Sequence, residues 1–509
     1  MDQCKRRMSR LVVNLALSTL AALLICGVAS AQASWPTHAH DAQHTSVSSV
    51  ASQPLAKIHW STPVDLHPVI TNGDILIHYG SPLITAANTV IVPVKTGANS
   101  FRVEAHDGAT GALKWKLSTD YKAPSAGFTP AFGPTLVGDT LFMPAAGGTV
   151  LVRSNVDDAS GTLTRIAFYG INNFNSDKGA FTQNVQINTP ITADAHGNIF
   201  FGFLVLGPTP VTLQSGLARI PAKGSAKWVG AQTVSGDALI TKVAVNCAPA
   251  LSHDGKTLYV ALGSVDFGVG DLLALNSTTL KLIREVRLLD PASGFFATIA
   301  DESSATPTVG PDGDVYFGVL EDPFPGHNDR GWLLHFNNDL SVEKIPGSFG
   351  WDDTASIVDA SLVPSYTGTS TYLLMTKYNN YAGIATGDGH NKIAILDPNA
   401  TEKDPVDHKT LVMHEVITIK GVTPDPDFPT FPGAVREWCI NTAAVDPFSK
   451  SVLANSEDGT LYRWDLVTKN FSERIKLSSG IGEAYTPTLI GPDGTVYAIN
   501  DAVLFAIGQ

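Results

Sequence analysis

A short pattern that recurs eight times constrains the fold of this 509-residue chain more than any other feature. Each copy opens with a Thr-Pro or similar pair, continues with a few apolar residues and a turn, and ends in a β-rich run. Six clear copies begin at Ser81, Thr129, Thr189, Ala248, Thr306 and Thr486, and two degraded copies begin at Ala360-Ser361 and Thr442-Ala443. The turn often reads Asp-Gly, in which Gly tolerates a positive φ and Asp closes the loop, so each copy predicts a hairpin.

The spacing of the copies, mostly 44 to 60 residues, leaves room for four short strands and their turns. Length alone would suggest about three domains. The repeats instead predict one all-β ring over residues 56–509, an eight-bladed β-propeller of four-stranded antiparallel blades, with seven blades as the alternative because two copies are degraded. Long amphipathic helical stretches are absent from the sequence after residue 31, which disfavours alternating strands and helices.

The two ends of the ring complement each other in the sequence. After the hairpin of the last copy, the chain supplies only one more β-rich run, Val503 to Ile507, and the blade lacks its outer strand. The β-rich segment from Ala56 to Val64 precedes the first copy and has no blade of its own. Pairing the two would remove two exposed sheet edges, so we predict that the N-terminal strand completes the C-terminal blade.

The sixth copy is the longest, with 82 residues between Ala360 and Thr442. Its excess includes Asp397-Pro398-Asn399 and the proline-rich stretch 424–433. Proline cannot donate to a sheet ladder, so we predict a long surface loop at 398–435. Such loops on a rigid ring often carry function, although an inert insertion is an equal alternative.

Residues 1–31 have the composition of an export signal. Four basic residues between positions 5 and 10 precede an apolar stretch from Leu11 to Val28, and Ala29-Ser30-Ala31 forms a small-x-small cleavage site. The alternative is an uncleaved membrane anchor. We expect a signal peptide at 1–31, an N-terminal segment at 32–55, and a periplasmic or secreted protein with no membrane insertion after cleavage.

Charge and cysteine content exclude several classes of protein. Without residues 1–31, the formal net charge changes from −13 to −16. This balance argues against nucleic-acid binding and against electrostatic binding to anionic lipid. Only Cys247 and Cys439 remain after the signal, too few for a disulfide scaffold. We expect two buried free thiols, with a bridge across the channel as the alternative.

One segment, from Ala105 to Trp115, resembles the tryptophan-docking motif of the PQQ-like β-propeller repeat, Ala-x-Asp-x-x-Thr-Gly-x-x-x-Trp. The matching positions are Ala105, Asp107, Thr110, Gly111 and Trp115. Degraded forms lie at 274–279 and 465–468, and the stretch from Trp35 to Thr45 is similar to the start of mature proteins in this group. The family includes quinoprotein alcohol dehydrogenases and assembly-factor propellers of bacterial outer membranes, and its Trp packs between neighbouring blades.

Local chemistry gives the same interpretation of this motif. Asp, two residues and then Thr form a turn in which the side chains bond the local backbone, and Gly111 allows a positive φ. Trp115 follows as a large apolar side chain whose N–H needs an acceptor. We therefore expect the motif to be structural.

Polar residues gather where the chain leads into the innermost strands, which line one mouth of a propeller channel. The candidates are Asn188, Asn246, Asp301, Asp359, Glu437, Trp438, Asn441 and Glu483. Carboxylates with amides could hold a hard cation such as Ca²⁺ or bind a polar ligand. The alternative is a hydrated mouth whose side chains satisfy backbone groups.

The resemblance to quinoprotein dehydrogenases implies a bound quinone (PQQ), a Ca²⁺ held by Glu, Asn and Asp, a catalytic Asp and usually a disulfide between adjacent cysteines. This sequence has no adjacent cysteines and no Cys-x-x-Cys-His, the c-type haem motif. It also lacks a phosphate-binding Gly-rich loop, Gly-x-Ser-x-Gly and His-Glu-x-x-His. His38, His40 and His44 fit no familiar zinc spacing, so we expect no metal site there.

These observations favour an exported, non-catalytic propeller that is a monomer and serves as a binding or interaction scaffold. Its partner, a protein or a small molecule, is not specified by the sequence. The alternative is a PQQ- and calcium-dependent periplasmic oxidoreductase on the same ring.

Overall fold

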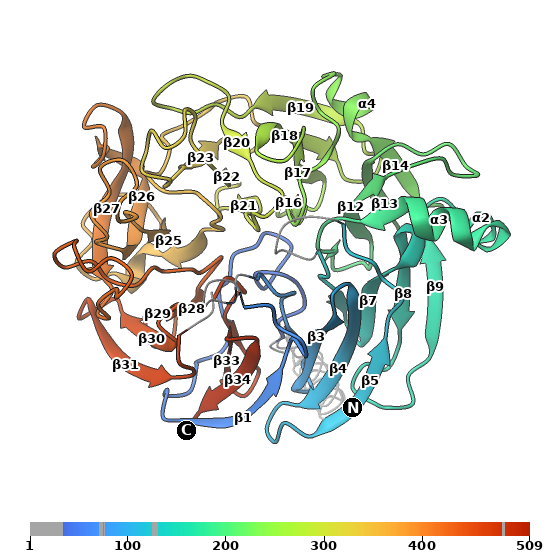
Figure 1. The fold of residues 1–509 in the computed structure, drawn as a ribbon, viewed down its shortest axis with the longest axis horizontal. Coiled ribbons are helices and arrows are strands. Elements are labelled where there is room, and N and C mark those ends of the chain that lie inside the picture. The colour runs from blue at the N-terminus through green and yellow to red at the C-terminus, as the bar shows by residue number, and fades with distance from the viewer. Residues whose placement is uncertain (1–33, 71–74, 76, 125–130, 481–483) are drawn as a thin grey trace, which may run out of the picture. The chain divides into compact units, whose positions relative to one another are not determined.

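Eight small antiparallel sheets arranged as a ring make up this protein (Figure 1). The structure, a computed structural model, describes residues 34–509 except 71–74, 76, 125–130 and 481–483. Residues 34–509 form one compact unit. The eight-bladed prediction is confirmed, whereas the predicted export signal lies outside the described residues.

The first four blades are numbered in chain order, each from its innermost to its outermost strand. Blade 1 contains β2 (Leu83–Ile84), β3 (Thr89–Gly97), β4 (Ser100–Asp107) and β5 (Leu113–Ser118). Blade 2 contains β6 (Thr135–Val137), β7 (Thr140–Ala145), β8 (Thr149–Arg153) and β9 (Leu163–Ala167). Blade 3 contains β10 (Val185–Ile187) and β11 (Thr192–Ala193), then β12 (Ile199–Val205), β13 (Gly216–Ile220) and β14 (Lys227–Gly230). Blade 4 contains β15 (Lys242–Val243) and β16 (Ala250–Leu251), then β17 (Thr257–Gly263), β18 (Gly268–Asn276) and β19 (Leu282–Arg287), and β20 (Thr298–Ile299) also pairs with β18.

The other four blades complete the ring. Blade 5 contains β21 (Thr308–Val309), β22 (Val315–Val319) and β23 (Trp332–Phe336). Blade 6 contains β24 (Ser356–Asp359), β25 (Tyr372–Tyr378), β26 (Lys392–Lys403) and β27 (Leu411–Lys420). Blade 7 contains β28 (Ala444–Asp446), β29 (Ser451–Asn455), β30 (Thr460–Asp465) and β31 (Asn470–Lys476). Blade 8 contains β32 (Leu489–Ile490), β33 (Val496–Asn500), β34 (Val503–Gly508) and β1 (Lys57–Pro63).

Short helices lie outside the sheets. They are α2 (Ile171–Ser176), α3 (Lys178–Asn184), α4 (Ala231–Ser235) and the 3₁₀ turns η1 (Ala146–Gly148) and η2 (Ala360–Leu362). No helix among the described residues is both long and apolar enough to cross a membrane.

The N-terminal strand closes the ring as the sequence predicts. β1 pairs antiparallel with β34, from Lys57 opposite Gly508 to Pro63 opposite Val503. Blade 8 therefore takes its outer strand from the start of the chain. Blade 5 has only three strands. The position of its fourth strand is marked by isolated bridges, Leu333 with Gly347 and Phe336 with Glu343.

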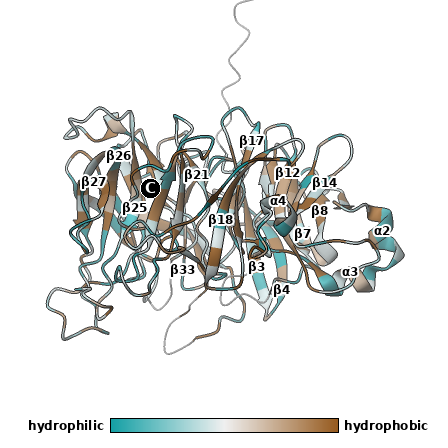
Figure 2. Cartoon of the chain, turned by 90° about the horizontal axis from the view of Figure 1, so that it is seen from above, coloured by the Kyte–Doolittle hydropathy of each residue, from teal (hydrophilic) through white to brown (hydrophobic). Residues whose placement is uncertain are grey.

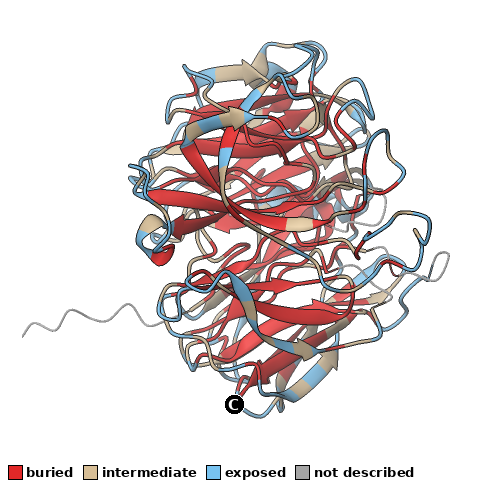
Figure 3. Cartoon of the chain, turned by 90° about the vertical axis from the view of Figure 1, so that its left-hand side faces the viewer, coloured by how far each residue is buried: buried red, intermediate tan, exposed pale blue. Residues whose placement is uncertain are grey.

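The two faces of each blade explain the burial pattern. Middle strands such as β25 and β33 are buried at every residue, because neighbouring blades cover both faces (Figure 3). The outermost strand β31 alternates between exposed and half-buried residues. Hydrophobic residues are accordingly concentrated in the strands, and the loops carry much of the hydrophilic surface (Figure 2).

Two predicted repeat boundaries are wrong by several residues. The innermost strand of blade 6, β24, precedes the expected start at Ala360-Ser361, which lies in η2. In blade 2, β6 begins at Thr135 directly after Pro134, whereas the expected pair Thr129-Pro130 lies outside the described residues. In blade 6, the position of the Thr-Pro pair is occupied by Thr354-Ala355. Because this pair lacks the proline, the sequence indicates its position only weakly.

The predicted loop at 398–435 is also wrong in part. β26 extends to Lys403, and β27 occupies Leu411 to Lys420. Residues 411–420 are rich in apolar and β-branched residues, and their preference for a strand prevails although prolines lie on either side. The irregular part of this region is the proline-rich stretch after Lys420.

The segment before β1 belongs to the ring and runs around its axis; we call residues 34–53 the belt (Figure 1, blue trace near the centre). Main-chain hydrogen bonds join it to seven blades and a side-chain bond joins it to blade 3, so that in chain order it reaches the inner parts of all eight blades. The pairs are Trp35 with Ile84, Pro36 with Leu136, Thr37 Oγ1 with Ile191, Ala42 with Leu251, Gln43 with Val309, Thr45 with Ile357, Ser46 with Val445 and Gln53 with Gly494. The belt therefore crosses one end of the channel.

Candidate functional site

The ring has two different faces. On the belt face lie the turns between first and second strands, next to the belt. On the opposite side, which we call the mouth face, the innermost strands begin and the second strands end. The sequence analysis placed the candidate residues on the mouth face.

Three predicted mouth residues are buried asparagines that join different blades. Asn188 Nδ2 donates to Val243 O at 2.8 Å, Asn246 Nδ2 to Asp301 O at 3.3 Å, and Asn441 Nδ2 to Ser304 O at 3.0 Å. Because each amide bonds the backbone of another blade, these side chains hold the ring together.

The axis is closed on the mouth face by a set of side chains that we call the mouth cluster: His78, Ser304, Asp352, Lys377, Asn441 and Tyr485. Ser304 donates to Asp352 Oδ1 from its backbone N at 2.6 Å and from its Oγ at 2.9 Å. His78 Nδ1 lies 3.1 Å from Ser304 Oγ, and the His78 ring packs on Tyr485 with centroids 3.7 Å apart. Lys377, 1% exposed, places Nζ 5.1 Å from the Tyr485 ring centroid.

Burial controls the protonation of this cluster. Burial, with Lys377 adding to it and Asp352 opposing it, lowers the pKa of His78 to about 4. Burial also raises the pKa of Asp353 well above its usual range, although Lys377 opposes that change. At neutral pH the cluster therefore contains a neutral His78 imidazole.

Two belt histidines approach the axis from the other side. Burial and the neighbouring His44 lower the pKa of His38 to about 3, and burial lowers the pKa of His44. His44 Nδ1 donates to Pro307 O at 2.7 Å. His40 instead bonds Asp41, so the three histidines of the sequence pattern do not converge.

The remaining axial cavity is small. It measures about 30 Å³ and is lined by residues such as His38, His78, Asn246 and Ser304. A water molecule needs about 10–15 Å³ by this measure, so the cavity has room for about two waters.

The other predicted mouth residues that the structure describes lie in three different environments. Asp301 and Glu437 are half-buried at the mouth, where Asp301 pairs with Lys242. Trp438 is 1% exposed and packs between blades against Tyr462 and Phe471, so its prediction as a ligand contact is wrong. Asp359 ends β24 on the belt face and caps η2 through Ser361 N, so its mouth assignment is wrong too, and Glu483 lies outside the described residues.

One group among the described residues brings three metal-ligand side chains within 4.8 Å: Glu437, Cys439 and Glu457. The Cys439 thiol donates to Glu457 at 3.1 Å, and burial raises the pKa of Glu457 to about 7. Arg436 Nη1 already lies 3.5 Å from Glu457, so a cation occupies one side of the group. A thiol is also a poor ligand for Ca²⁺.

The two cysteines of the ring are separate. Cys247 and Cys439 are both buried and are not joined by a disulfide bond, as expected. Burial raises the pKa of Cys247 to about 12, so this thiol stays protonated and unreactive.

The docking motif joins blades 8, 1 and 2. Asp107 Oδ1 accepts from Thr110 N and Oγ1, and Gly111 has a φ of 72°. Trp115 Nε1 donates to Val156 O in blade 2 at 2.7 Å. Trp60 on β1 donates to Gly108 O at 2.8 Å in the same way, and a Cβ on Gly111 would lie 2.5 Å from its ring.

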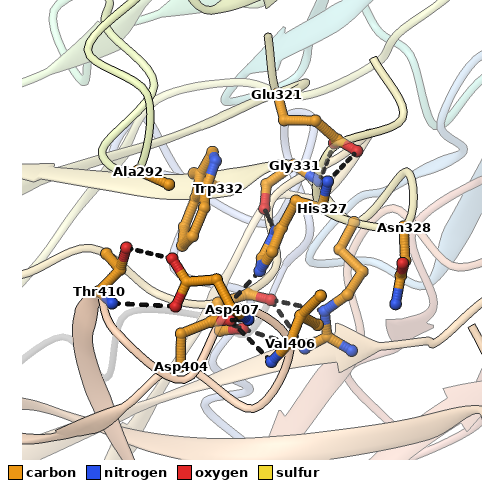
Figure 4. Close-up of polar contacts among 12 residues, drawn as sticks. Ala292, Glu321, His327, Asn328, Gly331, Trp332, Asp404, Val406, Asp407 and Thr410 are labelled. Atoms are coloured by element: carbon orange, nitrogen blue, oxygen red, sulfur yellow. Dashed lines mark hydrogen bonds and ion pairs between the residues drawn. The ribbon is translucent and has the colours of Figure 1, made fainter. Parts of the chain in front are cut away.

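A buried polar network links blades 5 and 6 (Figure 4). His327 stacks on Trp332 and its Nε2 lies 2.9 Å from Asp404 Oδ2, which also accepts from Ser348. Ser348 bonds the carboxylate and not the imidazole, and His327 Nδ1 is engaged by Gly331 O. A nucleophile must hydrogen-bond its base, so this network is structural.

On the belt face, a groove of about 700 Å³ lies between the belt and the turns of blades 2 to 4. Its carboxylates are already used by local turns: Asp194 accepts from His196 N and Asn198 N, and Asp41 accepts from Thr45 N. The hydrogen-bonding capacity of these two aspartates is therefore largely used within the loops and the belt that form the groove.

The sequence analysis missed His78, Asp352 and Lys377. Asp352 could have been predicted from the sequence. Thr354-Ala355 is a degraded copy of the Thr-Pro pair, and the two aspartates directly before it, Asp352 and Asp353, precede β24. His78 and Lys377 carry no sequence signal, because they reach the axis from a loop and from the end of β25.

The ring, its closure by β1 and the contacts between blades together define the protein as an eight-bladed β-propeller. No family model and no curated protein matches its sequence. Its fold is similar to that of a europium-containing methanol dehydrogenase, with 10% identity over 92% of this chain and 89% of that one and a TM-score of 0.55. It is also similar to a quinohemoprotein alcohol dehydrogenase from Comamonas testosteroni, with 11% identity over 94% and 81% and a TM-score of 0.52. These likenesses establish the fold.

The described residues do not fit a quinone at the axis. Pockets for ligands of that size measure about 300–1,000 Å³, far above the 30 Å³ of the axial cavity. Asp352 Oδ1, a carboxylate oxygen that could coordinate Ca²⁺, already accepts two hydrogen bonds from Ser304.

Proposed function

We propose that this chain is an exported propeller that acts as a binding scaffold, and that its mouth face carries the binding surface. The closed axis is the observation that supports this proposal most directly. The belt closes the channel from one side and the mouth cluster from the other, and a cavity for about two waters remains between them. Binding is therefore expected to involve the exposed loops rather than the axis of the ring.

Cofactor loading tests the alternative, a PQQ- and calcium-dependent oxidoreductase, which rests on likeness of fold alone. Mature protein is incubated with PQQ and Ca²⁺ and followed by thermal denaturation, bound-quinone absorbance and alcohol oxidation with an artificial electron acceptor. We expect no thermal shift, no bound quinone and no turnover. A shift that rises with quinone concentration, together with turnover, would overturn the scaffold proposal.

Site-specific photo-crosslinking in the producing cell tests the binding face. A crosslinking residue replaces Leu206, Val265 or Thr430 on the mouth face, and Leu113, Leu163 or Phe448 on the belt face. All six side chains are exposed, so access is matched. We expect discrete adducts from the mouth face, and adducts from the belt face alone would contradict the proposal.

A further inference from the structure

Six large apolar side chains are exposed together on the mouth face of blades 4 and 5. We call them the apolar rim: Leu239, Val265, Phe267, Phe295, Phe296 and Phe324, whose exposed fractions are 55, 71, 49, 59, 48 and 61%. Single exposed apolar residues are common on soluble proteins, whereas grouped ones mark interaction sites.

Contacts between neighbouring loops make the rim continuous across four loops. β20 pairs with β18 at Gly268 and Val269, which places the loop of Phe296 beside the loop of Phe267. Ser293 Oγ donates to Asp322 O and so joins the loops of Phe295 and Phe324. Figure 1 shows the strands that carry these loops, β17, β18, β20, β22 and β23, next to one another.

The fourth loop is joined through an arginine. The Arg287 guanidinium lies 5.0 Å from the Phe296 ring centroid and pairs with Asp237. Asp237 also accepts from Leu239 N at 2.7 Å. The loop of Leu239 is thereby joined to the loop of Phe296.

Acidic residues border the rim. Asp266 accepts from the backbone N–H of Phe267 and of Asp301, which places its carboxylate between the loops that carry Phe267 and Phe296. Burial and the neighbouring charges of Asp266, Asp352 and Asp301 raise the pKa of Glu302. The basic groups of these loops, Lys242 and Arg287, already pair with carboxylates, so the border keeps excess negative charge.

We propose that the apolar rim is a docking surface for a segment of a partner protein that presents apolar side chains flanked by Lys or Arg. Apolar residues would cover the phenylalanines, and the flanking cations would meet the acidic border and the ring faces. This inference rests on the proposed scaffold function and names the surface and partner chemistry.

The acidic border disfavours other occupants. A second copy of this chain, docked through the same face, would bring acidic groups against acidic groups. An anionic lipid surface would be repelled for the same reason. A basic, apolar protein segment is the occupant that satisfies both the apolar and the charged part of the surface.

Peptide binding to the mature protein tests the proposal. The probe is a dye-labelled peptide of Leu-Lys-Lys-Leu repeats, and the control peptide carries Glu in place of Lys. Binding is measured by fluorescence anisotropy over a range of salt concentrations. We expect the lysine peptide alone to bind. Phe296→Ser with Phe324→Ser should weaken binding at least about tenfold, and Asp266→Asn with Glu302→Gln should weaken it and flatten its salt dependence.

Phe448→Ser is the matched control, because Phe448 is 62% exposed on the belt face. It should bind as the parent does, and circular dichroism verifies that every variant is folded. Equal loss in the control, equal binding of the glutamate peptide, or no binding at all would overturn the proposal. So would self-association, or capture by anionic vesicles, if Phe296→Ser with Phe324→Ser abolished it. If the lysine peptide failed to bind but crosslinks formed from the mouth face, the docking proposal would be overturned and the proposed scaffold function would still be supported.

Discussion

At the axis of the ring, polar side chains such as His78, Ser304 and Asp352 are buried, whereas at the apolar rim phenylalanines are exposed. The axial groups bond one another across blades, so their polarity is used inside the molecule. The rim residues have large exposed fractions and acidic neighbours. The difference indicates that the axis supports the fold and that the rim is available to a partner.

The largest effect is expected from Trp35→Ala in the belt. Trp35 is fully buried against Ile84 and Val90, so its removal leaves a cavity and should lower the free energy of unfolding by about 3–5 kcal/mol. Chemical denaturation measures the change. Trp228→Ala, at a half-buried tryptophan of an outer strand, serves as the control and should cost less. Equal costs would mean that the belt adds no special support.

Asp352→Ala removes the acceptor of two Ser304 bonds and should lower the free energy of unfolding by about 1–3 kcal/mol. Asp352→Asn keeps an oxygen acceptor and should cost less. If the axis is structural, neither variant changes binding of the lysine peptide. Weakened peptide binding in a folded Asp352 variant would break the separation between axis and rim.

The His78 substitution tests how the axis responds to acid. The folded pKa of His78, about 4, lies below its unfolded value near 6.5, so the unfolded chain binds the proton first. Stability is therefore full above pH 6.5 and falls as pH decreases toward 4, by up to about 1.4 kcal/mol per pH unit for this residue. His78→Gln should flatten that fall in denaturation midpoints measured between these limits. An unchanged slope would show that His78 is hydrated.

The smallest effect is expected at the rim. Phe296→Ser should change the free energy of unfolding by less than about 0.5 kcal/mol, because the ring is largely exposed. Thermal and chemical denaturation of this variant beside Phe448→Ser measure it. A loss of several kcal/mol would mean that Phe296 belongs to the core and would weaken the docking proposal.

The fold was predictable because repeats and turns are local signals. Asp-Gly hairpins, blade spacing and the unpaired segment from Ala56 to Val64 led to eight blades and to the β1–β34 closure. Trp60 was missed as a docking tryptophan because it lacks the preceding Asp and Thr of the motif. Its acceptor, Gly108, lies in another blade.

The candidate site was harder to predict than the fold. Asn188, Asn246 and Asn441 lie before innermost strands, near the mouth. The sequence could not show that their amides bond the backbone of other blades. Asp359 was misplaced because a six-residue shift in one degraded repeat moves a side chain to the opposite face. The rim combines four loops, none of which has a motif.

The belt also determines when the protein can finish folding. It precedes every blade in the chain, yet its contacts extend to blade 8: Gln53 and Asp493, 440 residues apart in the sequence, are joined by a hydrogen bond. Contacts of such sequence separation form slowly, because the intervening chain must be ordered first. The first segment of the ring therefore waits, with Trp35 uncovered, until the inner strands exist, and a chaperone that shields this segment would speed assembly more than one that shields any single blade.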